Sequence, residues 1–193
     1  MDFRSCTRAV LLIPFMLGAG ALIQAAPEVA GPSTTSSQIR PDGAAGSNAA
    51  TTSAHADRLV SVIVAWLAAN FDLPAINDHV RIKFAPPPQI AALRYGVMGT
   101  DGGRHVLGVY VDRTKTIYLP EDWAGRSPAE ISVLVHELVH HLQHLDKRVY
   151  DCPEVREKLA YAAQEKWLGL FGRSLLQDFQ IDAMTLKVVT ACM

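Results

Sequence analysis

The chain lacks the features that would place it on a nucleic acid or inside a membrane. It carries 18 basic and 19 acidic residues among 193, so no excess of positive charge favours nucleic acid or an anionic lipid surface. After residue 26, no apolar run approaches the roughly 20 residues that are needed to cross a bilayer. We therefore expect no nucleic-acid partner and no stable membrane insertion of the mature protein.

The first 26 residues have the pattern of a secretory signal peptide. Arg4 and Arg8 precede the apolar run Ala9–Ile23, and small residues follow at Gln24–Ala26, near an expected cleavage point. Removal of this segment also removes Asp2, which leaves 16 of the 18 basic and 18 of the 19 acidic residues. We expect an exported protein, either periplasmic or secreted.

Residues 27–54 contain no aromatic residue and are rich in Ala, Ser, Thr, Gly and Pro. Such a segment buries too little apolar surface to offset its conformational entropy, so the composition predicts a flexible tether. The remaining residues, 55–193, suffice for one domain with a single hydrophobic core. The expected organisation is a signal peptide (1–26), a tether (27–54) and one domain (55–193).

Cysteine is scarce, with three residues in the chain, and Cys6 would leave with the signal peptide. In an exported protein, the remaining pair, Cys152 and Cys192, predicts a disulfide bond. Two separate buried thiols are the alternative.

The hydrophobic pattern predicts an α+β domain. Helices are expected at 57–71, 89–95, 131–144 with its cap at Ser127, 153–171 and 174–189, and strands at 79–85, 106–112 and 116–119. The last two strands are joined by a tight turn and form an antiparallel hairpin. This hairpin could bind an extended peptide by strand addition or have a structural role alone.

The stretch His136–His140 has the pattern H-E-x-x-H. Residues four apart share one face of an α-helix, so both histidines can bind the same metal ion. Glu137 lies about 100° further round the helix, where its carboxylate can act as a general base on a metal-bound water. Ser127, followed by a proline and then by Glu130, predicts the capped start of that helix. The pattern therefore predicts a catalytic zinc site.

A catalytic zinc ion usually has three protein ligands, so a third ligand is expected outside the motif. We predict Glu157, because Ala160 on the same helix face would let its helix approach the motif helix closely. Glu154 and Asp146 are the alternatives, and His144 on the motif helix is a further one. Asp146 stands six residues after the second histidine, where metzincin sequences place their third ligand, but Gln143 replaces the glycine of that pattern.

Tyr161 lies on the same predicted face as Glu157 and is the second candidate catalytic residue after Glu137. Its hydroxyl could donate a hydrogen bond to the oxyanion that forms during amide hydrolysis. A core tyrosine beside the site is the alternative. Gln164, also on this face, could orient a metal ligand.

The stretch Val135–Gln143, with the pattern E-x-x-A-Y-x-x-Q at 157–164, resembles the gluzincin group of zinc metallopeptidases. The third zinc ligand of that group is a Glu on the helix after the H-E-x-x-H helix. The similarity covers roughly residues 105–171 and is greatest to small secreted bacterial members, many of them uncharacterised. It implies a small zincin-like domain, in which a short antiparallel sheet precedes the motif helix and a Glu-bearing helix. The chain is far shorter than thermolysin-like members and lacks their substrate-binding domain, so the resemblance implies no particular substrate.

These expectations combine into an exported zinc-dependent peptidase. Zinc held by His136, His140 and Glu157 would polarise the scissile carbonyl and lower the pKa of its bound water. Glu137 would take the proton of that water and pass it to the leaving amine. The alternative function is a non-catalytic zinc-binding interaction module on the same scaffold. The expected partner is a peptide or protein substrate. The sequence leaves the oligomeric state open, with a monomer as the expectation.

Overall fold

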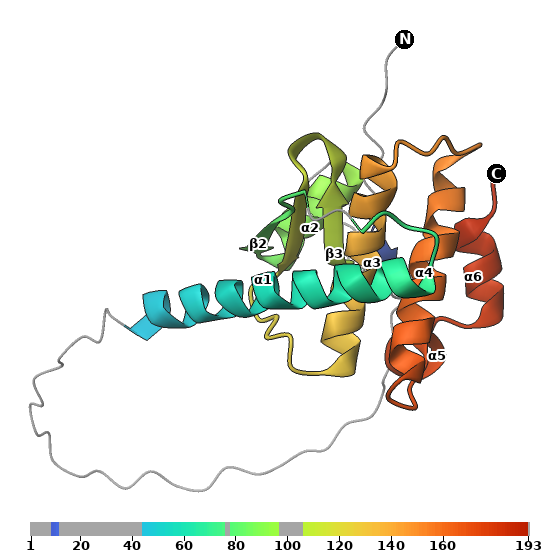
Figure 1. Cartoon of the computed structure of the whole chain (residues 1–193). Coiled ribbons are helices and arrows are strands. Elements are labelled where there is room, and N and C mark those ends of the chain that lie inside the picture. The colour runs from blue at the N-terminus through green and yellow to red at the C-terminus, as the bar shows by residue number, and fades with distance from the viewer. Residues whose placement is uncertain (1–8, 12–43, 76–77, 97–105, 193) are drawn as a thin grey trace, which may run out of the picture.

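The computed structural model describes residues 9–11, 44–75, 78–96 and 106–192, which form helices around a small sheet (Figure 1). The helices are α1 (Ala44–Asn70), α2 (Pro87–Tyr95), α3 (Pro128–Leu145), α4 (Pro153–Gly169), α5 (Leu175–Phe179) and α6 (Ala183–Thr190). The strands are β1 (Ala9–Leu11), β2 (Arg81–Ala85), β3 (Val106–Val111) and β4 (Thr116–Pro120), and a 3-10 turn, η1 (Asp112–Thr114), joins β3 to β4. The predicted α+β class is confirmed.

The sheet has the strand order β1-β3-β4-β2 and is mixed. The predicted hairpin of β3 and β4 is confirmed, with Val109 opposite Tyr118, and β1 extends it by pairing antiparallel with β3. The expectation of a purely antiparallel sheet is wrong, because β2 pairs parallel with β4. A parallel pair needs a crossover connection, and the chain makes that crossover through α2 and β3.

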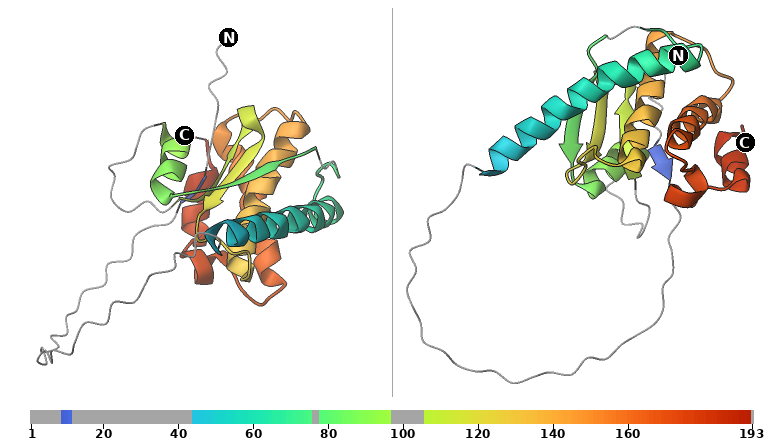
Figure 2. Two further views of the ribbon diagram at one scale, coloured as in Figure 1. Left: turned by 90° about the vertical axis from the view of Figure 1, so that its left-hand side faces the viewer. Right: turned by 60° about the horizontal axis from the view of Figure 1, so that its bottom comes forward.

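The sheet separates two groups of buried side chains. Ile117 and Leu119 of β4 pack with Leu134 of α3 and with α1 in the main core. Val109 of β3 packs with Ile90 of α2 in a smaller cluster. Neighbouring residues of a strand point to opposite faces, so α2 covers one face and α3 the other (Figure 2).

Helix α1 begins earlier than predicted. It starts at Ala44, so residues 44–54 of the expected tether are helical. Among the residues of α1 from 51 onward, Ala56 is the first that is buried in the core, and the first part of α1 extends beyond the sheet (Figure 1). Alanine has the highest helix propensity and elongation of an existing helix costs little, which favours a helix in this alanine-rich segment. The expected tether residues 27–43, most of the expected signal peptide and the expected loop at 98–104 lie outside the described residues.

The prediction of one final helix over 174–189 is wrong, because the chain forms α5 and α6 instead. Gln180 ends α5 in the left-handed region, with a φ of 57°. Asp182 then caps α6, and its carboxylate accepts a hydrogen bond from the Thr185 amide at 2.7 Å. Phe179 and Ile181 are both buried on either side of the break. The interruption between α5 and α6 therefore results from core packing, since there is no glycine or proline between the two helices.

The predicted disulfide is confirmed. Cys152, the residue before α4, is bonded to Cys192, which follows α6, and their Cα atoms lie 5.8 Å apart. The bond ties the C-terminal helices to the start of the helix that carries Glu157. None of the described helices is long and apolar enough to cross a bilayer.

Candidate metal centre

Helix α3 starts where the sequence predicts. Ser127 Oγ accepts a hydrogen bond from the Glu130 amide at 3.2 Å, and the Glu130 carboxylate accepts from the Ser127 amide at 3.0 Å. Glu130 also accepts hydrogen bonds from the amides of Ala124 and Arg126, each at 3.1 Å. Burial acts to raise the pKa of Glu130, but these hydrogen bonds outweigh it and hold the pKa below its ordinary value. This capping box fixes the helix start, and with it the face on which both motif histidines lie.

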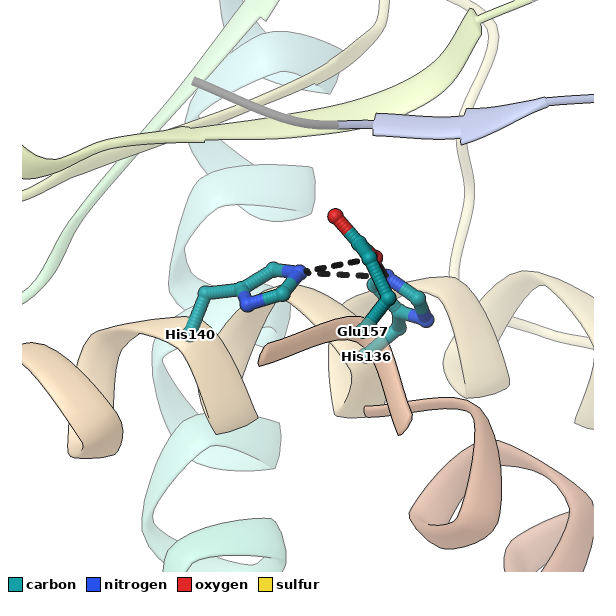
Figure 3. A group of neighbouring side chains, drawn as sticks. All are labelled: His136, His140 and Glu157. Atoms are coloured by element: carbon teal, nitrogen blue, oxygen red, sulfur yellow. Dashed lines mark hydrogen bonds and ion pairs between the residues drawn. The ribbon is translucent and has the colours of Figure 1, made fainter. Parts of the chain in front are cut away.

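Three of the predicted residues meet between α3 and α4. Glu157 Oε2 lies 3.2 Å from His136 Nε2 and 3.4 Å from His140 Nε2 (Figure 3). The two Nε2 atoms lie 3.2 Å apart. His136, His140 and Glu157 are 0%, 4% and 3% exposed, respectively. Within the described part of the chain, no other three His, Cys, Asp or Glu side chains converge in this way. The group could therefore hold a metal ion.

The alternative third ligands lie elsewhere. Asp146 caps the end of α3 and pairs with Arg148. His144 Nδ1 lies 3.7 Å from a carboxylate oxygen of Asp112. Glu154 is not part of the group at the metal centre. Because α3 stays helical as far as Leu145, it carries its last residues away from the centre.

Helix α4 approaches α3 through its small residues, as predicted. Ala160 and Ala163 are fully buried between Glu157 and the end of the helix. Tyr161 is 4% exposed, and its ring packs edge-on against His136 with centroids 4.7 Å apart. Tyr161 therefore holds the ring of one candidate ligand in place, and its predicted catalytic role stays a prediction.

Unpartnered oxygen atoms of two buried carboxyls, Glu157 and Glu137, indicate that a cation or water belongs near them. Burial acts to raise the pKa of Glu157, but the charge of His140 and hydrogen bonds with both imidazoles hold it below its ordinary value. Within the described residues, Glu157 Oε1 and Glu137 Oε1 are buried without a hydrogen-bond partner. Buried carboxylate oxygens are rarely left without a donor, a cation or water.

Glu137 faces the sheet rather than α4. Its Oε2 atom accepts a hydrogen bond from the backbone amide of Tyr110 in β3 at 2.8 Å. Burial raises the pKa of Glu137 to about 7, and the Glu157 carboxylate adds to this rise, whereas the charge of His136 and the Tyr110 amide lower it. The carboxyl is thus held by a fixed donor, near enough to His136 and Glu157 for their charges to act on its pKa.

Close approach of β3 to α3 requires Gly108. A Cβ atom at this position would lie 2.9 Å from Val133 Cγ1 and 3.2 Å from Glu137 Cγ. Both distances are shorter than ordinary van der Waals contact, so a side chain here would displace α3 or the Glu137 side chain. A glycine inside a strand otherwise rich in β-branched and aromatic residues is a signal of such an approach. The role of Gly108 was nevertheless not predicted from the sequence.

Two glutamines contact the other ring nitrogen of each histidine. Gln164 Oε1 lies 3.1 Å from His136 Nδ1, and Gln143 Oε1 lies 3.1 Å from His140 Nδ1. Gln164 was expected to orient a ligand, whereas the role of Gln143 was missed. Gln143 stands three residues after His140 on the same helix, and this spacing could have indicated that the two side chains are in contact.

Comparison with curated proteins and with solved structures gives no match to this chain. The model of one family, described as a domain of unknown function (DUF6647), matches residues 52–192. The matched region begins inside α1, contains the capping box, the candidate metal centre and the disulfide, and covers most of the chain. The chain therefore belongs to the DUF6647 family.

Proposed function

We propose that this protein is an exported zinc-dependent peptidase of gluzincin type. The observation that carries the proposal is the buried convergence of His136, His140 and Glu157, next to a buried Glu137 whose carboxyl is held by the backbone of β3 and whose pKa the charges of His136 and Glu157 shift. Two imidazoles and one carboxylate leave the fourth position of a tetrahedral ion for water, which is the pattern of catalytic rather than structural zinc sites.

The spacing of the three donor atoms supports zinc. Ligand atoms at 2.0–2.1 Å from a tetrahedral ion are about 3.3–3.4 Å apart. The distances among His136 Nε2, His140 Nε2 and Glu157 Oε2 are 3.2, 3.2 and 3.4 Å. Imidazole nitrogen suits zinc better than it suits magnesium or calcium, which prefer oxygen ligands. Bound there, zinc would polarise a carbonyl and activate water.

Glu137 is placed to move the protons of amide hydrolysis. Its Oε2 atom is occupied by the Tyr110 amide, so the carboxyl cannot rotate freely. Its Oε1 atom has no partner among the described residues and would take the proton from the attacking water. The same oxygen would then deliver the proton to the nitrogen of the leaving amine. Tyr161, packed against His136, would donate a hydrogen bond to the oxyanion.

The sheet edge next to Glu137 supports an extended peptide as the substrate. Strand β1 pairs antiparallel with β3, and Ala9 lies opposite Val109. If residues 1–26 are removed on export, the edge of β3 becomes available to another strand. A peptide bound there by strand addition would lie beside the residue whose amide holds Glu137.

One observation favours a non-catalytic zinc-binding module as the second candidate. The three ligands are almost fully buried, and structural zinc sites are closed to solvent. In that case a fourth protein group or a tightly held water would complete the site, and no substrate would reach it.

Metal content and hydrolysis together test the proposal. The exported protein would be purified as wild type, Glu157→Ala and Glu137→Gln, and zinc per chain measured by elemental mass spectrometry. We expect one zinc in wild type and in Glu137→Gln, and a marked loss in Glu157→Ala. Cleavage of a peptide panel by wild type, with a loss of about 10²–10⁴-fold in Glu137→Gln, would establish the peptidase.

The other outcomes separate the alternatives. Zinc in wild type without cleavage of any peptide would favour the non-catalytic module. No zinc in wild type, even after reconstitution, would overturn both functions. Equal zinc in wild type and Glu157→Ala would move the third ligand to another residue.

A further inference from the structure

The two glutamines at the metal centre have amide groups whose orientation is determined by their other contacts. Gln143 lies on α3 and Gln164 on α4, and both are buried. An amide has a donor end and an acceptor end, so identifying one end assigns the other. The amide end that faces each histidine then indicates whether the Nδ1 atom of that histidine carries a proton.

The orientation of Gln143 follows from a backbone carbonyl. Its Nε2 atom lies 3.1 Å from the carbonyl oxygen of Arg156, which can only accept a hydrogen bond. The amide end at Arg156 must therefore be the NH₂ group, and Oε1 must face His140 Nδ1 at 3.1 Å. An oxygen there accepts a hydrogen bond from Nδ1–H, so a neutral His140 directs its Nε2 lone pair at a metal in the centre.

The orientation of Gln164 follows from a chain of two hydrogen bonds. Ser132 Oγ lies 2.7 Å from the carbonyl oxygen of Ala129, so the serine proton is committed to that carbonyl. Ser132 Oγ can then only accept, and it accepts from Gln164 Nε2 at 3.2 Å. Gln164 Oε1 must therefore face His136 Nδ1 at 3.1 Å, and in its neutral form this histidine also directs an Nε2 lone pair at a metal in the centre.

We infer that Gln143 and Gln164 are positioning residues that hold His136 and His140 in the Nδ1–H tautomer and aim both Nε2 lone pairs at the metal. This inference rests on the proposed metal site. Because an amide carries no charge, neither glutamine adds negative charge to the centre. The metal keeps more of its positive charge than it would beside carboxylate partners, and with it more power to polarise a carbonyl.

The two glutamines also fix the distance between the helices. Gln143 reaches from α3 to the backbone of Arg156 on α4, and Gln164 reaches from α4 to Ser132 on α3. Glu157 lies on α4 between these two cross-links. The contacts that set the histidine tautomers therefore also place the third ligand.

Nuclear magnetic resonance tests the tautomers without reference to activity. The full chain would be labelled with ¹⁵N-histidine and recorded at pH 8, free of metal and with zinc added. We expect a proton on Nδ1 of both His136 and His140 in both samples, assigned with single histidine variants. An unprotonated Nδ1 on either residue would overturn the inference.

Zinc affinity, measured by competition with a chromogenic chelator, tests the positioning role. Gln143→Met and Gln164→Met keep the size of the side chain but remove the acceptor, and we expect zinc affinity to fall 10–100-fold. Gln177→Met, at an exposed site on α5, is the matched control and should bind zinc as wild type does. Gln164→Glu keeps an oxygen facing Nδ1 and should recover most of the affinity that Gln164→Met loses.

A purely structural role gives a different pattern. Gln164→Glu would then bind zinc as weakly as Gln164→Met, because both lose the NH₂ donor to Ser132. That result would refute the positioning role. A zinc affinity of Gln164→Met within about threefold of the wild-type affinity, in place of the expected 10–100-fold loss, would refute it as well. If wild type binds no zinc, the proposed function fails while the resonance experiment still decides the tautomers. If wild type binds zinc and an Nδ1 proton is missing, only this inference fails.

Discussion

Gly108 in β3 lies directly against Glu137 in α3. A Cβ atom on Gly108 would lie 3.2 Å from Cγ and 3.3 Å from Oε1 of the glutamate. The same strand donates the Tyr110 amide hydrogen bond to the other carboxylate oxygen. The distance between β3 and α3 thus sets the position of the candidate general base, and the absence of a side chain at residue 108 permits that distance.

Gly108→Ala is expected to impair both stability and hydrolysis. The added methyl group would overlap Val133 Cγ1 at 2.9 Å, and overpacking of this kind costs about 1–3 kcal/mol. It would also displace Glu137 from the Tyr110 amide, so cleavage should fall more than zinc content. Urea unfolding, peptide cleavage and metal analysis measure the three effects.

Gly169→Ala is the matched control for this substitution. A Cβ atom at Gly169, the last residue of α4, meets nothing within 4 Å. Alanine is also the better helix former, so this variant should be as stable as wild type or slightly more stable. Wild-type activity and stability in Gly108→Ala would show that close packing of β3 on α3 is not needed.

The capping glutamate should make stability depend on pH. The pKa of Glu130 is lowered in the folded protein, so its stabilising effect is present above the unfolded pKa of about 4.5 and is lost as pH falls toward the folded pKa. Glu130→Gln should therefore reduce the free energy of unfolding by about 1 kcal/mol at pH 7. The difference from wild type should shrink at more acidic pH.

Denaturant unfolding of both proteins between pH 3 and pH 7 measures this effect. Glu121→Gln, at an exposed position before α3, should match wild type at every pH because exposed charges contribute little. If the free energy of unfolding of Glu130→Gln differs from that of wild type by the same amount at every pH, the stabilisation comes from the shape of the side chain rather than from its charge.

The disulfide should contribute strongly to stability. Cys152 and Cys192 are 40 residues apart, and a loop of this length predicts a loss of about 4 kcal/mol when the bond is absent. The double variant Cys152→Ser with Cys192→Ser should show this loss in urea unfolding. A reductant should reproduce the loss in wild type and leave the double variant unchanged. An effect of reductant on the double variant would mean that the loss has another origin.

Zinc should stabilise the folded protein in proportion to its affinity for the centre. A ligand that binds only the folded state adds about 2.7 kcal/mol at a free concentration of 100 times its Kd. Thermal unfolding should therefore shift upward with zinc and downward with a chelator. Glu157→Ala should lose this shift, whereas Glu154→Ala, which alters a residue outside the group at the centre, should keep it. Equal shifts in both variants would contradict the assignment of Glu157.

Short-range features of the site could be predicted because their causes lie within a few residues. The capping box of Ser127 and Glu130 involves residues three apart, and the common face of His136 and His140 follows from helical spacing. The start of α1 could not be predicted in this way. Its first turns are rich in Ala, Ser and Thr without an aromatic residue, a composition that resembles that of a tether.

Features that depend on distant segments were only partly predictable. The sequence offers Glu154, Glu157 and Asp146 as third ligands, and the packing of α4 on α3 through Ala160 brings Glu157 alone to the histidines. The break at Gln180 depends likewise on the core that its neighbours enter. Local pattern carries no information about such partners.

The sequence by itself determined the motif helix, the position of two histidines and a glutamate on it, and the α+β class, because helix periodicity and capping are local properties. Only the tertiary structure decided which carboxylate joins the histidines, which amides orient them, and how closely Gly108 approaches Glu137. Except for the local contact between Gln143 and His140, these contacts join residues far apart in the chain, and packing of the whole core sets their distances.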